Sequence, residues 1–229
     1  MKDKLDDIIK SICVVCIVGA IIAYMLIYYS GKNETFVYEE HLSENVLTVS
    51  DESDATHKIS VNLQEMTYYV MNIEGNIHEM ALQYNSDNPE AYWSVKIEKG
   101  TYTMKDYAKD WAFDSCVRDN IYYIEALKSG IKLTEEEKDM AENDAKTILS
   151  NLSGKALGVS NFDLQSLYNI EEKLYLTSKY LDILVEQGHT MEELELKGTY
   201  YEELRQNYSI ATNDKLWDKV RFGNITITK

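Results

Sequence analysis

Proline is almost absent from this chain, which has one proline and ten glycines among 229 residues. Flexible or extended linkers between domains are rich in glycine, serine or proline, so the composition argues against a string of loosely tethered domains. With 45% hydrophobic residues, a chain of this length can bury one sizeable core and at most a small second unit. We therefore expect one main folded domain.

Cysteine and histidine are also scarce, with three and four residues respectively. Cys13 and Cys16 lie in an apolar run, where neither a second ligand pair nor hydrated chemistry is expected, and we interpret them as small helix-packing residues. Cys116, the remaining cysteine, is interpreted as a buried filler. No two histidines lie within four residues of each other, so the sequence predicts no metal site. Fingerprints of serine hydrolases, P-loop proteins and dinucleotide-binding proteins are missing, and we predict no cofactor and no enzymatic activity.

Basic residues are too few to balance the acidic ones: 23 lysines and arginines stand against 39 aspartates and glutamates, which gives a net charge of −16. Such a surface would repel the phosphate backbone of a nucleic acid. We therefore expect no nucleic-acid partner. The acidity is interpreted as an ordinary solvated surface.

Charged residues are missing altogether from residues 11–31. A run of ~20 apolar residues can span the hydrocarbon core of a bilayer. The run ends in Met25-Leu26-Ile27-Tyr28-Tyr29, bulky residues that suit a membrane interface and make a poor cleavage site, so an uncleaved anchor is favoured over a cleaved signal peptide. Three lysines precede the run and one, Lys32, follows it. We expect a single-pass membrane protein with a cytoplasmic N-terminus and an extracytoplasmic C-terminal domain.

The predicted organisation follows from this anchor. Residues 1–10 form a cytoplasmic tail, 11–31 the transmembrane anchor, 32–45 a spacer and 46–229 a mainly helical domain. Three amphipathic helices between Thr103 and Gln187 form the centre of that domain, because apolar residues recur there at steps of three and four. Their starts are marked by the capping pairs Thr103/Asp106, Thr134/Glu137 and Ser160/Asp163, and the first and third end at Gly130 and Gly188.

Shorter elements flank the three helices. Val46–Val49 and His57–Ile59 are predicted strands, Ser60 is predicted to cap a long helix, and Pro89 to begin a short one. Further helices are expected after Thr190, after Thr199 through Tyr208, and after Asn213. Because strands this short are not stable alone, we expect Val46–Val49 to pair with Ile225–Thr228. The predicted fold class is therefore mainly α, with a small β pairing between the two ends of the domain.

This order of elements resembles the N-terminal chaperone domain of the SurA and PrsA foldases, and in particular the short extracytoplasmic relatives found in Gram-positive bacteria. The resemblance covers residues 46–229. It rests on Val46–Val49, the segment Asn88-Pro89-Glu90-Ala91-Tyr92-Trp93, the phrase Gly130-Ile131-Lys132-Leu133-Thr134-Glu135-Glu136-Glu137, Leu157-Gly158-Val159-Ser160, and Leu216-Trp217-Asp218-Lys219.

The sequence departs from this family at one place. Full-length foldases of the group insert a parvulin-type prolyl isomerase module between the helical trio and the returning helix, where this chain has only residues 188–199. A domain of ~100 residues cannot fit there. The resemblance thus implies binding of unfolded or partly folded polypeptide without isomerisation. The alternative is an interaction or assembly module for one dedicated partner or for a second copy of the chain.

Aromatic pairs supply the candidate binding residues. Tyrosine and methionine can contact many side chains and tolerate water, and the chain has 18 tyrosines and 8 methionines. Adjacent side chains on a helix point ~100° apart, so at most one member of a pair can be central to the core. The predicted peptide-binding residues are Tyr69, Met71, Tyr92, Trp93, Tyr123 and Tyr200. The alternative is that these residues only bridge helices at the edge of the core.

Overall fold

The computed structural model describes residues 36–97 and 100–223 of the chain. The chain divides into two compact units, Met1–Val37 and Tyr38–Lys229, and the helices and strands described below belong to the second. The predicted anchor, residues 11–31, and the predicted terminal strand Ile225–Thr228 lie outside the described residues. Among the residues that are described, no helix is both long and apolar enough to cross a membrane.

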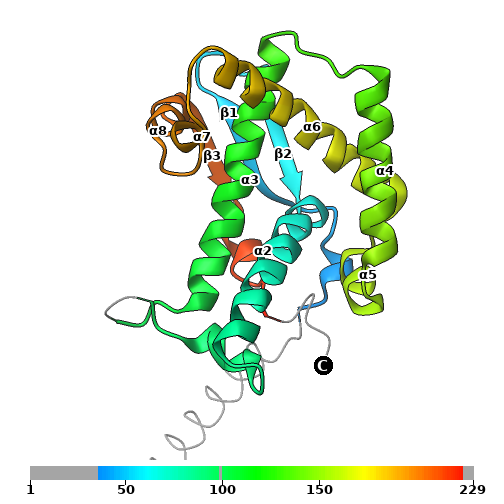
Figure 1. Ribbon diagram of the computed structural model, residues 1–229, viewed down its shortest axis with the longest axis vertical. Helices are drawn as coiled ribbons and strands as arrows, with labels where there is room; N and C mark the ends of the chain where they lie inside the picture. Colours follow the sequence, from blue (N-terminus) through cyan, green and yellow to red (C-terminus); the bar gives the residue numbers. More distant parts are fainter. Residues whose placement is uncertain (1–35, 98–99, 224–229) are drawn as a thin grey trace, which may run out of the picture. The chain divides into compact units, whose positions relative to one another are not determined.

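Helices dominate the second unit, and a small sheet accompanies them (Figure 1). The strands are β1 (Asn45–Asp51), β2 (Lys58–Asn62) and β3 (Tyr208–Thr212). The long helices are α2 (Leu63–Tyr84), α3 (Met104–Lys128), α4 (Glu135–Asn151) and α6 (Leu164–Glu186). The short ones are α5 (Gly154–Ser160), α7 (Met191–Leu194), α8 (Thr199–Arg205) and α9 (Asp214–Trp217), with 3-10 turns η1 (Tyr38–Glu40) and η2 (Pro89–Ser94). The prediction of a mainly helical fold with a small β component is confirmed.

The sheet is antiparallel and has the order β2-β1-β3. Val49 in the central strand lies opposite Ile59 on one side and Ile210 on the other. The prediction that Tyr208 continues a helix is wrong, because α8 ends at Arg205 and Tyr208 begins β3. Burial alternates along β3, as expected for a strand with one face on the core. A segment near the end of the chain therefore does pair with β1, and in the described part of the chain it is β3.

The core lies where the long helices meet one another and the sheet. Helix α3 packs against α2 and α6, and α4 packs along α6 (Figure 1). Each fully buried aliphatic side chain in such a core contributes ~1.5–3 kcal/mol through loss of apolar surface to water. The buried apolar residues recur at helical spacing along these helices and include Met66, Val70 and Ile77 of α2, Val117, Ile121 and Ile124 of α3, and Leu167, Ile170 and Leu184 of α6.

Local start and stop signals are confirmed at most helix ends. Thr103 with Asp106 and Thr134 with Glu137 form reciprocal capping boxes at the starts of α3 and α4. Gly130 has a φ of 70°, which lets the chain leave α3 through a left-handed residue that glycine adopts without strain. These ends are set by neighbouring residues alone.

Two predicted starts are wrong. Ser60 lies inside β2, opposite Thr48, and α2 is capped by Asn62, whose side chain accepts from the backbone N–H of Glu65. Ser160 ends the additional helix α5 and does not start α6, whose N-cap is Asp163 in a capping box with Ser166. The central region therefore has four helices where three were predicted.

Candidate functional site

Each of the four aromatic pairs has one buried member and one half-buried member. Tyr69, Trp93, Tyr122 and Tyr201 are buried, whereas Tyr68, Tyr92, Tyr123 and Tyr200 are half-buried. The prediction that at most one member of each pair is central to the core is confirmed. The ~100° angle between adjacent side chains explains the split.

Three of the six predicted binding residues lie in the core. Tyr69, Met71 and Trp93 expose 5%, 8% and 5% of their surfaces. The Trp93 ring lies so close to Gly223 that a Cβ on that glycine would be 3.2 Å from the ring. These three side chains hold the domain together and present little surface to a ligand.

The other three lie in separate environments. The Tyr92 ring contacts that of Tyr84 with a centroid distance of 5.2 Å, and the Tyr200 ring contacts His189 at 4.5 Å. Tyr123 lies on α3 and lines a pocket. The six predicted residues thus do not form one groove, and of these six only Tyr123 contributes to that pocket.

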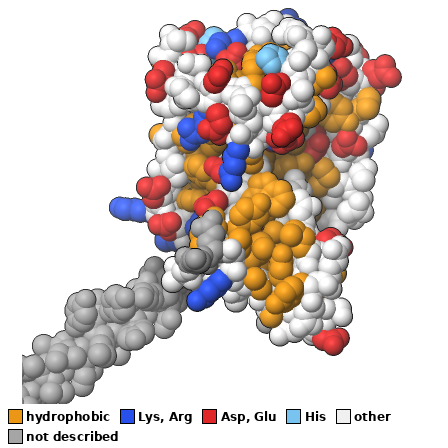
Figure 2. Space-filling model, turned by 60° about the vertical axis from the view of Figure 1, so that its left-hand side comes forward, with side chains coloured by type: hydrophobic (Ala, Val, Ile, Leu, Met, Phe, Trp, Pro, Cys, Tyr) orange, Lys and Arg blue, Asp and Glu red, His pale blue; other side chains and the backbone are white. Residues whose placement is uncertain are grey.

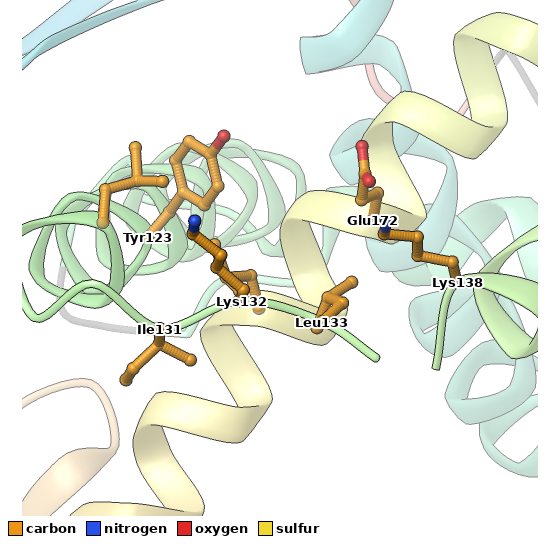
Figure 3. Close-up of a pocket in the computed structure, with 8 residues that line it drawn as sticks. Tyr123, Ile131, Lys132, Leu133, Lys138 and Glu172 are labelled. Carbon is orange, nitrogen blue, oxygen red and sulfur yellow. The ribbon is translucent and has the colours of Figure 1, made fainter. Parts of the chain in front are cut away.

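This pocket, called the α3–α4 pocket below, has a volume of about 310 Å³. It lies among the last turns of α3, the connection to α4, the first turn of α4 and the middle of α6 (Figure 3). Gly130 ends α3 and the Thr134 capping box starts α4, so the short connection between them is held at both ends. The lining residues are Tyr123, Leu127, Ile131, Lys132, Leu133, Lys138, Glu172 and Leu176.

The lining is apolar in its middle and charged at its rim. Figure 3 shows the Lys132 side chain extending toward Tyr123, and the Lys138 side chain extending toward Glu172. Lys138 also pairs with Glu135 at 2.7 Å. The Lys173 ammonium lies 5.5 Å from the centroid of the Tyr123 ring and is paired with Glu65. Such a pocket can hold an apolar side chain and offers positive charge beside it.

Of the residues that line this pocket, Tyr123 is the one that was predicted from the sequence as a binding residue. The sequence does contain a signal for this pocket, because Ile131 and Leu133 are apolar residues in a four-residue connection between two helix caps. Loop residues of this kind are usually polar and solvated. Leu176 and Glu172 could not be assigned, because only the packing of α6 against α4 brings them to the pocket.

Two other pockets are less suited to a polypeptide. One, of about 290 Å³, is lined by Glu142, Leu164, Gln165 and Tyr168. The second, of about 230 Å³, is lined by polar side chains around an ion-pair network. In that network Lys128 Nζ lies 2.8 Å from Asp51 Oδ2 and 2.6 Å from Glu125 Oε1. These charges pair with one another, which suits a role in holding α3 against β1.

Chemically reactive groups are sparse in the described residues. Cys116 is buried in α3, and burial raises the pKa of its thiol well above the usual value. A thiol held protonated in this way is a poor nucleophile. Within residues 36–97 and 100–223, no group of three or more His, Cys, Asp or Glu side chains is placed to hold a metal ion.

Exposed apolar side chains also gather at one end of the domain. Met80 and Tyr84 at the end of α2 expose 43% and 61%, and Ile97 and Tyr107 near the start of α3 expose 42% and 38%. Figure 2 shows a hydrophobic area in the lower half of one face, with acidic side chains above it.

Comparison with protein-family models, curated proteins and solved structures finds no match.

Proposed function

We propose that this domain is a chaperone-like, non-catalytic binder of unfolded or partly folded polypeptide, and that the α3–α4 pocket takes an apolar side chain of the bound chain. The observation that carries the proposal is the pocket itself. It combines four aliphatic side chains and the Tyr123 ring in a volume of about 310 Å³. A pocket lined in this way recognises apolar groups without selecting one sequence.

The exposed apolar end of the domain supports weak and adaptable binding. Contiguous apolar surface on a soluble domain often marks an interaction site. This end exposes Met80, Tyr84 and Tyr107, and methionine and tyrosine side chains tolerate both water and varied partners. An unfolded chain could contact this end and the pocket through different segments.

The region between α6 and α8 supports a function without prolyl isomerisation. Residues 188–198 contain turns and the four-residue helix α7. Thr190 caps this helix together with Glu193, and the Tyr122 hydroxyl donates to the Leu194 carbonyl at 2.9 Å. The segment is thereby packed onto α3.

One substitution pair tests the proposal. Leu127, which lines the pocket, exposes 41% of its surface, and Leu157, on α5 and away from the pocket, exposes 39%. Leu127→Ser should weaken the binding of a permanently unfolded, alkylated model protein by at least about threefold, because apolar burial is lost. Leu157→Ser should leave the affinity unchanged. Equal affinities for the two variants would refute the role of the pocket.

A dedicated interaction or assembly module is the second candidate function. It is favoured by the placement of the six predicted residues, since three are core residues and the remaining three are not joined in one broad surface. A module with one partner needs only a local pocket. Suppression of aggregation of several unrelated client proteins would support the chaperone-like role, whereas tight binding of a single partner without such suppression would support the module.

We also propose that residues 11–31 anchor the protein in a membrane with residues 46–229 outside the cytoplasm. The support is the uncharged apolar run that the sequence contains. Protease added to intact cells should digest the C-terminal domain. N-terminal sequencing of the mature protein should begin at Met1, and a start near residue 30 would show that the anchor is cleaved.

A further inference from the structure

The α3–α4 pocket carries a charge arrangement that points to a particular kind of ligand. We propose that it binds the C-terminal residue of a polypeptide, with the apolar side chain of that residue inside the pocket and its carboxylate at Lys132. This inference rests on the proposed polypeptide-binding function. It goes further by naming the chemical group that the pocket selects.

Pocket size limits the ligand to a small anchor. Pockets that hold drug-sized ligands have volumes of ~300–1,000 Å³, and this one, at about 310 Å³, is at the lower limit. It therefore accommodates one or two residues of a polypeptide and not a long segment. The remainder of the chain would have to leave through the open side.

Lys132 supplies the charge that the ligand has to balance. Lys138 is already paired with Glu135 at 2.7 Å and extends toward Glu172 (Figure 3). Among the described residues, Lys132 forms no ion pair with a carboxylate within 4.0 Å. Its backbone carbonyl accepts from Lys179 Nζ at 3.1 Å, which fixes the point from which its side chain extends. On a chain of net charge −16, this rim is a local site for an anion.

The distribution of charge around the pocket places the carboxylate on one side. Glu172 and Lys138 lie together at one rim, and Lys132 lies toward Tyr123 at the other (Figure 3). Lys173, whose ammonium is 5.5 Å from the centroid of the Tyr123 ring, is paired with Glu65 and leaves Lys132 as the cation available to a ligand on this side. An anionic group is thus attracted to the Lys132 side and repelled by Glu172 on the opposite side.

A terminal carboxylate fits this geometry better than an acidic side chain. In a C-terminal residue the apolar side chain and the carboxylate share one Cα, so both can reach a pocket and its rim together. In an extended peptide the side chains of neighbouring residues point to opposite faces. An acidic residue two positions away lies ~7 Å along the chain. Because Lys132 lines the same pocket as the apolar side chains, this arrangement favours the C-terminal residue.

Three peptides test the inference with the full-length chain. All are ten-residue glycine–serine peptides with an N-terminal fluorophore. The first ends in leucine with a free carboxylate, the second ends in leucine amide, and the third has an internal leucine followed by aspartate and ends in an amide. Fluorescence anisotropy gives the affinities at low and high salt. The proteins are the native chain, Lys132→Gln and, as a matched control, Lys215→Gln, which changes an exposed lysine on α9.

We expect the free carboxylate to bind at least about threefold tighter than the amide, a ratio typical of an exposed ion pair. Added salt should reduce the ratio. Lys132→Gln should bring the ratio to about one without changing the affinity for the amide, and Lys215→Gln should leave the ratio unchanged.

The opposite outcomes separate this inference from the proposed function. Equal binding of carboxylate and amide by the native chain, or an unchanged ratio in Lys132→Gln, would overturn the inference and leave apolar polypeptide binding intact. Binding of the aspartate peptide as tightly as the free carboxylate would overturn the choice of a C-terminal residue. Failure of every peptide and of the unfolded model protein to bind would overturn the proposed function itself.

Discussion

The ion pair between Lys128 and Asp51 allows a quantitative prediction of stability. It joins the last turn of α3 to the end of β1 across 2.8 Å, and the two side chains expose 32% and 2% of their surfaces. Lys128→Met keeps most of the aliphatic stem and removes the charge, so Asp51 would remain buried without its cation. Removing one partner of a fully buried pair costs ~3–5 kcal/mol, and an exposed pair contributes at most ~1 kcal/mol. Because one partner here is buried and the other is partly solvated, we expect a loss of about 2 kcal/mol.

The pH dependence of this loss follows from the pKa of Asp51. Hydrogen bonds from Lys128 and then from Ser53 lower the pKa of Asp51 well below its ordinary value in the folded state. A carboxylate with a lowered folded-state pKa stabilises the fold at neutral pH and loses that contribution as pH falls through the lowered pKa. In Lys128→Met, protonation at low pH removes the unpaired charge of the buried Asp51 carboxylate. The difference in free energy of unfolding between the native chain and Lys128→Met should therefore be largest at pH 7 and should shrink below about pH 5.

Urea denaturation at pH 7 and pH 3.5 measures the effect. The matched control is Lys146→Met, because the ion pair of Lys146 with Glu142 is exposed on both sides, at 51% and 45%, and should contribute less than ~0.5 kcal/mol. A second test combines Lys128→Met with Asp51→Asn, which should recover part of the loss. The reasoning would be refuted if Lys128→Met cost no more than Lys146→Met at pH 7, or if its cost were the same at both pH values.

Four further predictions concern local features of the fold. Gly198→Ala should destabilise the α7–α8 turn by ~1–3 kcal/mol in urea denaturation, because the added Cβ would lie 2.3 Å from the carbonyl oxygen of Glu192; an unchanged midpoint would contradict the close approach. Thr134→Ala should lower the free energy of unfolding by ~1 kcal/mol, because it removes the side-chain cap of α4. Leu133→Ala, at the preceding residue, should weaken peptide binding more than it weakens the stability of the fold, because Leu133 lines the α3–α4 pocket. Cys116 should react with a thiol reagent at pH 8 far more slowly in the native protein than in urea, because burial raises its pKa, and rapid native labelling would show that α3 opens.

In the aromatic pairs, helical spacing determines one property and leaves another open. That one residue of each pair faces the core follows from helix geometry and is observed four times. Which residue faces the core does not follow from the pattern. Tyr69 and Trp93 face the core, yet in the third pair it is Tyr122, because its hydroxyl reaches the Leu194 carbonyl on α7. The selection of Tyr69 and Trp93 as ligand-facing residues rested on composition, which does not report on such contacts.

Two of the three misplaced boundaries, those at Ser60 and Tyr208, have a common physical cause. Ser60 has the chemistry of a helix cap, but its backbone is paired with Thr48 of β1, so the strand continues to Asn62 and the helix starts one residue later. Tyr208 likewise continues the apolar spacing of α8, but it pairs with Asp51, and the rest of β3 pairs with the preceding residues of β1. In both cases backbone pairing with β1, 12 residues earlier for Ser60 and more than 150 residues earlier for Tyr208, outweighs the local helical signal.

Helix ends such as those at Thr103, Gly130 and Thr134 depend on hydrogen bonds within a few residues, and the amino-acid order is enough to locate them. The same is true of the mainly helical character and of the uncharged run at residues 11–31. The three-stranded sheet and the α3–α4 pocket required the folded chain, because β3 and α6 contribute groups from distant positions. Contacts of this kind depend on packing between elements, and a linear pattern carries no record of which elements meet.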